Sequence, residues 1–327
     1  MMRLSRVPLL LLLFWSLTLE AQGQRFTPRN PECIAPAGAG GGWDFTCRSA
    51  AQFLYELKLV PQPIRVTNMV GGGGGVAYTH VVTQRSADPN LIVAASPATT
   101  VRLAQGQFGR YTERDVRWLG AVAADFGLLA VRGDAPWKTL GEFLEAWKAD
   151  PTKIAISGGS AVGGQDHMKV LLLARAAGIP LRSVRYVPYD GGGEALTALL
   201  GGFVQAFAGD ASETRGQLEA GAVRVLATLS DRRLGGPYQR IPTAKELGYD
   251  VSWVVWRGFY VGKEIPADAY DFWSQALLRL ARSPEWSRFL AQSSLEPLVQ
   301  VGAPFHVFID RQVADFRRLS RELGLIR

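Results

Sequence analysis

Two glycine-rich segments, each between an apolar run and a helical pattern, constrain the fold of this chain more than any other feature. The first covers residues 37–42 (AGAGGG), and the second is the run of glycines at 71–75. A loop that joins a strand to a helix exposes backbone N–H groups that the helix cannot satisfy. These donors and the positive end of the helix dipole suit an anion, which glycine allows to approach closely. Neither loop contains a lysine, a metal ligand or a nucleophile, so the pattern predicts binding rather than catalysis.

The N-terminus has the pattern of a secretory signal peptide. Arg3 and Arg6 precede an apolar run over 7–19, and Ala21 and Gly23 provide the small residues of a cleavage motif. The run is too short to span a bilayer, no cysteine at the cut would accept a lipid, and no later stretch is apolar enough to cross a membrane. We therefore expect residues 1–23 to be removed near Gly23 and the mature chain to be exported and soluble.

The mature chain is long enough for two domains. Apolar strands alternate with helical patterns, which indicates an α/β fold with mainly parallel sheets. Strands are predicted at 64–68, 91–95, 128–131, 153–156, 184–187, 204–208, 223–229 and 251–261, and helices at 140–147, 165–177, 194–200, 267–281, 284–291 and 304–323.

The last three helices have no predicted strand between them, so we expect them to pack back on the first sheet. Domain 1 would then be discontinuous, with residues 24–126 and 256–327, and domain 2 would comprise residues 127–255. No proline- or serine-rich linker separates the halves. Two closely spaced crossover strands, rather than a flexible tether, would form the hinge.

Cysteine usage and charge set further limits. Cys33 and Cys47 are the only cysteines, and in an exported protein such a pair is expected to form a disulfide. The bridge would clamp the first glycine loop between its ends. The formal net charge is +7, but the basic residues are scattered and lack repeated aromatic partners, which argues against nucleic-acid binding.

Two more loops repeat the strand–loop–helix arrangement, at 157–167 and 187–193. In the first, the Ser160 hydroxyl and nearby N–H groups could hold an anionic oxygen. A secreted hydrolase that uses Ser160 and His167 is the alternative, although Val162 replaces the last glycine of the G-x-S-x-G pattern. His167 could equally pack or form a hydrogen bond within its helix.

Several polar residues keep two roles open. Asp44 and Asp210 could each cap a helix or contact a ligand.

The second glycine tract fits a relaxed dinucleotide pattern, but the next strand ends at Ser96 without the acidic residue that this pattern requires. The three histidines lack metal-binding spacing, so we expect neither a cofactor nor a catalytic metal. Four anion-suited loops on two domains predict a cleft whose closure is coupled to binding.

The motifs resemble, in order, those of the tripartite tricarboxylate transporter receptors (the TctC or Bug family). They are residues 33–44 with Arg48, residues 68–75, Gly159-Ser160 with His167, and residues 187–192. The resemblance implies a two-domain periplasmic-binding-protein (type II) fold and a non-enzymatic, periplasmic receptor, expected to be a monomer. It also implies a small carboxylate ligand, delivered to the large and small permease subunits of a membrane transporter. The cysteine pair and the run at 158–164 are most similar to the citrate-binding branch, so a tricarboxylate is expected.

In this family the ligand is held largely by loop backbone groups and bridging waters, with few charged side chains, which agrees with the arginine-free loops here. The positions expected to bind the ligand are Ala37, Gly38, Gly41, Asp44, Gly73, Gly74, Ser96 and Asp125 in domain 1, and Ser160, Ala161, Gly163, His167, Tyr189, Gly191 and Asp210 in domain 2. Val70 and Asp190 depart from the proline and the basic residue that many members have there. A receptor that presents its solute to a membrane sensor would share this fold and site, and neighbouring permease genes would distinguish the two.

Overall fold

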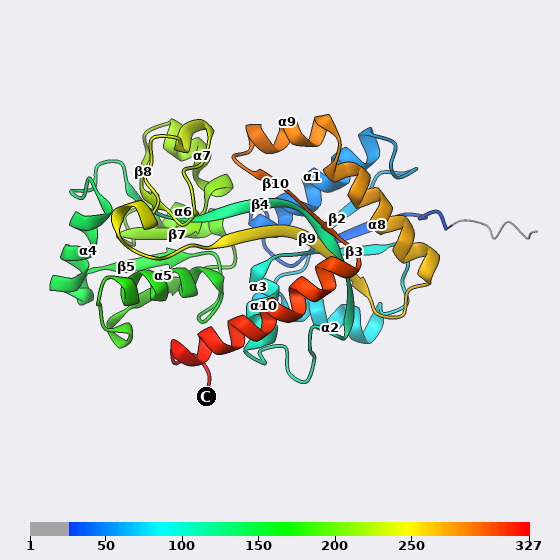
Figure 1. The fold of residues 1–327 in the computed structure, drawn as a ribbon, viewed down its shortest axis with the longest axis horizontal. Helices are drawn as coiled ribbons and strands as arrows, with labels where there is room; N and C mark the ends of the chain where they lie inside the picture. Colours follow the sequence, from blue (N-terminus) through cyan, green and yellow to red (C-terminus); the bar gives the residue numbers. More distant parts are fainter. Residues whose placement is uncertain (1–25) are drawn as a thin grey trace, which may run out of the picture.

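The computed structural model describes residues 26–327, and the predicted signal peptide lies outside this range. Figure 1 shows two lobes side by side, with the long strands β4 (Val116–Arg132) and β9 (Val254–Gly262) running across both. The predicted two-domain α/β architecture is confirmed. Within residues 26–327, no helix combines the length and the apolar character needed to cross a bilayer.

The first lobe contains the N-terminal elements and the C-terminal helices. Its N-terminal elements are β1 (Glu32–Ala35), α1 (Gly42–Glu56), β2 (Arg65–Asn68), α2 (Gly75–Gln84), β3 (Leu91–Ala95) and α3 (Pro97–Ala104). Its C-terminal elements are α8 (Ala267–Ala281), α9 (Pro284–Gln292), β10 (Glu296–Val301) and α10 (Ala303–Glu322). β1 pairs in parallel with both β2 and β3. One face of this sheet packs on α1, α8 and α9, and the other packs on α2, α3 and α10.

The second lobe contains the middle of the chain. Its elements are α4 (Leu140–Ala149), β5 (Ala155–Gly158), α5 (Gln165–Ala176), β6 (Arg185–Pro188), α6 (Gly192–Leu200), β7 (Ala206–Asp210), α7 (Ala211–Glu219) and β8 (Val223–Thr228). β5 pairs in parallel with β6 and β7. Helices α4 and α5 cover one face of these strands, and α6 and α7 cover the other.

One mixed sheet runs through both lobes, in the order β2-β1-β3-β9-β4-β7-β5-β6. β4 pairs antiparallel with β7 and β8 of the second lobe and with β9 and β10 of the first lobe. The prediction of mainly parallel sheets therefore holds for β1, β2 and β3 and for β5, β6 and β7, but it fails for β4 and β9, whose pairings are all antiparallel. In the crossing pair, Asp125 lies opposite Val255 and Phe126 lies opposite Val254, close to the two predicted crossover points.

Two sequence predictions were wrong in this region. The strand predicted at 128–131 is the end of a much longer β4, whose first half contains small residues with little preference for strands. Glycine is required at position 120 of this strand, because a Cβ atom there would lie 2.6 Å from the main-chain oxygen of Gln300. The second wrong prediction is that no strand lies between the last three helices, because β10 separates α9 from α10. Its pairing with β4 shifts register between Pro297 and Gln300, as is common where proline lies in a strand at the sheet edge.

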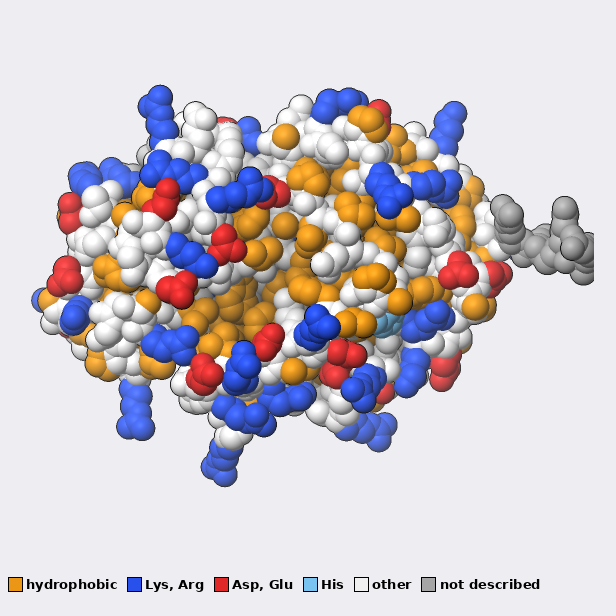
Figure 2. Space-filling view, viewed as in Figure 1, with side chains coloured by type: hydrophobic (Ala, Val, Ile, Leu, Met, Phe, Trp, Pro, Cys, Tyr) orange, Lys and Arg blue, Asp and Glu red, His pale blue; other side chains and the backbone are white. Residues whose placement is uncertain are grey.

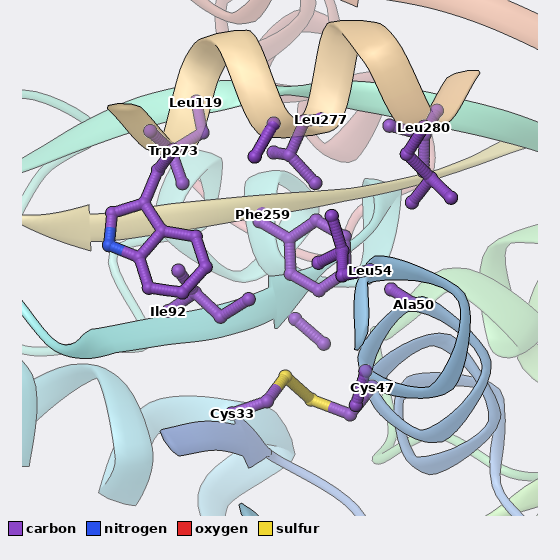
Figure 3. Packing of buried hydrophobic residues seen from close by; sticks show 14 of the residues in the cluster. Cys33, Cys47, Ala50, Leu54, Ile92, Leu119, Phe259, Trp273, Leu277 and Leu280 are labelled. Atoms are coloured by element: carbon purple, nitrogen blue, oxygen red, sulfur yellow. A yellow bond between two sulfur atoms is a disulfide. The ribbon is translucent and has the colours of Figure 1, made fainter. Parts of the chain in front are cut away.

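The core of the first lobe holds the predicted disulfide (Figure 3). Cys33 on β1 and Cys47 on α1 are fully buried and bonded, with their Cα atoms 5.8 Å apart. Beside them, Leu54 of α1 and Leu277 of α8 are buried in the same apolar cluster as Phe259 of β9. The disulfide thus joins both ends of the first glycine loop and fixes the start of α1 against the sheet.

Candidate ligand-binding site

A cavity of about 460 Å³ lies where the four predicted loops converge. Its walls come from the loops at 36–43, 70–73, 159–166 and 188–194, so both lobes contribute. The predicted site residues that line it are Ala37, Gly41, Gly73, Ser96, Ser160, Ala161, Tyr189, Gly191 and Asp210. The volume is suited to a small organic molecule.

The first and fourth loops meet across the cavity without side chains between them. A Cβ atom at Gly41 would lie 3.6 Å from the Cα atom of Gly191. Gly41 is the N-cap of α1, and Gly191 is the N-cap of α6, so two helix N-termini from opposite lobes lie close together. Their free N–H groups create a positive potential at this end of the cavity.

The second glycine tract requires glycine at successive positions. Gly71, Gly72, Gly73 and Gly74 have φ values of +131°, +60°, +62° and +95°, a region that side chains disfavour. The tract leads directly into α2. A Cβ atom at Gly73 would lie 3.4 Å from Nε of Arg102, so this guanidinium lies against the tract.

The third loop contains the serine and histidine of the hydrolase alternative. Oγ of Ser160 accepts a hydrogen bond of 3.0 Å from the N–H of Asp166, and Nδ1 of His167 accepts one of 2.9 Å from the N–H of Gly163. Burial lowers the pKa of His167 to about 4, and its ring packs 4.7 Å from that of Tyr186. Between Ser160 and His167, no hydrogen bond occurs in the part of the chain that the structure describes. The chain therefore has no activated nucleophile at this position.

Six predicted site residues lie outside the cavity lining: Gly38, Asp44, Gly74, Asp125, Gly163 and His167. Asp44 is buried in the first turn of α1. Its carboxylate accepts hydrogen bonds from the N–H of Gly40 at 2.9 Å, from Nε of Arg48 at 2.9 Å and from Nδ2 of Asn68 at 2.8 Å. Although burial raises the pKa of Asp44, these bonds lower it overall. Asp44 thus fastens the first glycine loop to α1 and β2.

A buried ionic network lies beneath the cavity and was missed by the sequence analysis. Nη2 of Arg257 donates to Asp125 at 2.5 Å and to Asp210 at 2.9 Å. Nζ of Lys169 donates to Asp210 at 2.5 Å and to Asp166 at 2.7 Å. Burial alone would lower the pKa of both cations, but the neighbouring aspartates raise it, so both stay charged. Asp210 is also the N-cap residue of α7, which is one of the two roles that the sequence left open for it, and it lines the cavity as well.

The second lobe presents further acidic groups to the cavity. Asp190 and Glu194 lie on its wall, and the Glu213 carboxylate lies against the main chain of Gly192 at the start of α6. Glu213 accepts a 3.1 Å hydrogen bond from the N–H of Asp210. Burial, with the nearby charges of Asp210 and Asp166, raises the pKa of Glu213 to about 8. The loops contain no arginine, as predicted, but Arg102 and Arg257 reach the cavity from α3 and β9.

A second hollow, of about 420 Å³, lies on the face seen in Figure 2, where hydrophobic side chains gather between α5 and α10. It is apolar, with Trp253, Phe308 and Phe316 among its lining residues. None of the predicted site residues lines it. None of the residues that line this hollow is charged.

Comparisons with known proteins agree with this geometry. The family model "Tripartite tricarboxylate transporter family receptor" matches residues 48–325. A Cupriavidus necator protein, "UPF0065 protein in gbd 5′ region", is 26% identical over 308 residues, covering 94% of this chain and 91% of its own. MatC from Rhodopseudomonas palustris, solved with malate, has a TM-score of 0.79 at 22% identity and covers 90% of this chain and 99% of its own. Another R. palustris protein, solved with adipate, has a TM-score of 0.81 at 21% identity, covering 90% and 97%. These two structures share the fold.

Proposed function

Because the chain belongs to the tripartite tricarboxylate transporter receptor family, which comprises solute-binding proteins and not enzymes, we propose that it binds a small carboxylate in the cavity between its lobes. The observation that carries this proposal is the convergence of four glycine-containing loops, two from each lobe, on one cavity. Their N–H groups and helix N-termini suit a carboxylate. Because both lobes contribute, a bound ligand favours the closed arrangement over the open one.

The proposed cellular role follows from the same membership. The chain is exported by its signal peptide, is cleaved near Gly23, and acts in the periplasm as a monomer. It delivers its ligand to the large and small permease subunits of a tripartite transporter. In this proposal, residues 24–126 and 256–327 form one domain and residues 127–255 form the other, because β4 and β9 cross between the lobes near these borders.

The ligand is proposed to be a di- or tricarboxylate. Malate and adipate are bound by two proteins that share the fold, and the cavity volume of about 460 Å³ is large enough for citrate as well. A thermal-shift screen of the mature protein against these acids tests the proposal. A ligand present at about a hundredfold its Kd stabilises the folded protein by about 2.7 kcal/mol.

A matched pair of variants tests the position of the site. Gly72 and Gly73 have nearly the same positive φ, but Gly73 lines the cavity, and a Cβ atom at Gly72 would meet open space. Asparagine tolerates this conformation, so Gly72→Asn and Gly73→Asn carry a similar backbone cost. We expect only Gly73→Asn to lose the ligand-induced shift. If both variants keep it, the ligand binds elsewhere.

A further inference from the structure

Glu213 is a carboxyl group of the buried network that has no cationic partner among the described residues. The ion pairs of the two cations are Lys169–Asp166, Lys169–Asp210, Arg257–Asp125 and Arg257–Asp210. Three aspartates therefore already exceed the two cations by one negative charge. An ionised Glu213 would raise this excess to two in a cluster that is shielded from water, so the arrangement favours a proton on Glu213.

The groups around Glu213 come from several elements, and most of them are acidic. They are Asp210 at the N-cap of α7, Asp166 and Lys169 of α5, Arg257 of β9 with its partner Asp125 of β4, Tyr186 of β6, and Asp190 and Glu194 on the same cavity wall. Burial and the charges of Asp210 and Asp166 raise the pKa of Glu213 to about 8, and the two cations offset only part of this rise. Burial also raises the pKa of Tyr186 well above its usual range, so this phenol stays neutral.

The two carboxyl oxygens of Glu213 have different surroundings. Oε2 accepts a 3.1 Å hydrogen bond from the N–H of Asp210. Oε1 forms no hydrogen bond within residues 26–327 and is not one of the enclosed polar atoms, and the side chain is partly exposed where it lines the cavity. Because Oε2 already accepts, a proton on this carboxyl belongs on Oε1, where the O–H group can donate to a bound molecule.

This O–H group lies at the end of the cavity where two helix N-termini meet. The Glu213 carboxyl lies against the main chain of Gly192, which follows Gly191, the N-cap of α6. Gly191 in turn lies close to Gly41, the N-cap of α1. A carboxylate bound here is attracted by the N–H groups of both helices. An ionised Glu213 would repel it, whereas a neutral Glu213 can donate a hydrogen bond to it.

We infer that Glu213 binds the ligand in its protonated form and that its Oε1–H group donates a hydrogen bond to a carboxylate of the ligand. This inference rests on the proposed function, since it assigns a contact within the same cavity. A neutral carboxyl gives the arginine-free loops a strong hydrogen bond to an anion without a further cation. Binding of the ligand is then coupled to binding of a proton.

Calorimetric titration of the mature protein with malate, adipate and citrate tests the inference. For each acid that binds, we expect the Kd to rise by about tenfold for each pH unit above about 8, because only the protonated fraction of the protein binds. Malate and adipate stay fully ionised between about pH 7 and about pH 9.5, so their own titration does not contribute. In buffers that differ in their heat of ionisation, the wild type should take up close to one proton per ligand at about pH 9.

Variants of Glu213 separate this contact from other effects of pH. Glu213→Gln carries an amide donor at every pH, so the ratio of its Kd at about pH 9.5 to that at about pH 7 should fall towards one. Glu213→Met has no donor, and its affinity at about pH 7 should fall by about tenfold. Glu219→Gln, at an exposed position of α7, is the matched control and should show the wild-type rise in Kd. Thermal melting without ligand verifies that each variant folds, and the proton uptake of the wild type needs no variant.

The outcomes distinguish the two proposals. If a carboxylate binds with the same Kd across the pH range and without proton uptake, or if the Kd of Glu213→Gln rises with pH as steeply as that of the wild type, the present inference is overturned and the proposed function stands. If none of the carboxylates binds at any pH, both fail together. A wild-type rise that is abolished in Glu213→Gln and kept in Glu219→Gln supports the inference.

Discussion

Nη1 of Arg102 donates a 2.9 Å hydrogen bond to the main-chain oxygen of Val162, which lies on the opposite side of the cleft. Next to it, Nε2 of Gln105 donates a 2.7 Å hydrogen bond to the main-chain oxygen of Gly163. Both bonds run from the first lobe to the third loop in the second lobe. Since Nε of Arg102 also lies against Gly73, one side chain connects the glycine tract with the facing lobe. We expect this arrangement to couple ligand binding to closure of the lobes.

Replacement of this arginine should weaken both closure and binding. Arg102→Met keeps the aliphatic part of the side chain and removes the donors, so we expect the Kd for the ligand to rise by about tenfold or more. Calorimetry measures this change, and small-angle scattering should show a larger radius of gyration than for the wild type. Arg110→Met, at an exposed position in the segment that follows α3, is the control. Wild-type affinity and compactness in Arg102→Met would contradict the coupling.

Removal of the Asp44 carboxylate should loosen the first glycine loop. Asp44→Ala leaves Gly40, Arg48 and Asn68 without their acceptor, and we expect a loss of about 1–3 kcal/mol in the free energy of unfolding at neutral pH. Because the bonds lower the pKa of Asp44 below its usual 3.8, its contribution is present above that pH and is lost as the pH falls through the lowered value.

Urea denaturation at neutral pH and in acid measures both effects. Glu56→Ala, at an exposed position near the end of the same helix, should cost much less. Equal losses in Asp44→Ala and Glu56→Ala would show that the carboxylate of Asp44 does not fasten the loop.

Loss of the disulfide should destabilise the protein. Cys33 and Cys47 are 14 residues apart in sequence, and closure of a loop of this size contributes about 3 kcal/mol in the chain-entropy treatment. We expect a decrease of this order in the free energy of unfolding for the double variant Cys33→Ala, Cys47→Ala. Urea denaturation with and without a reductant measures it. The reductant should lower the stability of the wild type and leave that of the double variant unchanged; sensitivity in both would mean that the reductant acts elsewhere.

The titration of Glu213 should appear in the pH dependence of stability. Burial and the neighbouring aspartates raise its pKa from 4.5 to about 8 in the folded protein. The stabilising contribution of the protonated carboxyl is therefore complete below pH 4.5 and is lost as the pH rises through about 8. We expect Glu213→Gln, which cannot ionise, to be less sensitive than the wild type to a rise in pH across this range.

Thermal melting over a series of pH values tests this prediction. Glu219→Gln, at an exposed position of the same helix α7, should follow the wild type throughout. If the curves of Glu213→Gln and wild type run parallel between pH 4.5 and 8, Glu213 titrates outside this range.

Local sequence patterns were sufficient to predict the two-domain α/β fold and the position of the four loops. Glycine tracts allow a loop to adopt positive φ values where a strand leads into a helix, and each one lies at a helix N-terminus in the structure. The first half of β4 and the strand β10 could not be predicted in this way. Small residues in β4 and a proline in β10 weaken the local signal, and the two segments are stabilised as strands by pairing with each other.

The charged network could not be predicted because its partners are far apart in the sequence. Arg257 and Asp125 are separated by 132 residues, and Lys169 and Asp210 by 41. Asp125 and Asp210 were expected as ligand contacts and not as partners of buried cations. Arg257 gave a signal of its own, since it interrupts an otherwise apolar segment, and a charge that is buried there needs a partner. The sequence analysis treated the segments that contain Arg257 and Lys169 as ordinary core elements. Arg102 gave no such signal, because it lies on a helix that the glycine pattern does not include.

The passage of β4 through both lobes has a consequence for dissection of the protein. This strand forms ladder hydrogen bonds with four others, two in each lobe, so neither half could be excised without baring a long, unpaired edge in the other. Exchange of one lobe for the corresponding lobe of a relative would replace the strands that pair with β4 in that lobe and leave its other pairing partners unchanged. Chimeras that aim to exchange specificity are therefore better built by grafting individual loops onto an intact sheet.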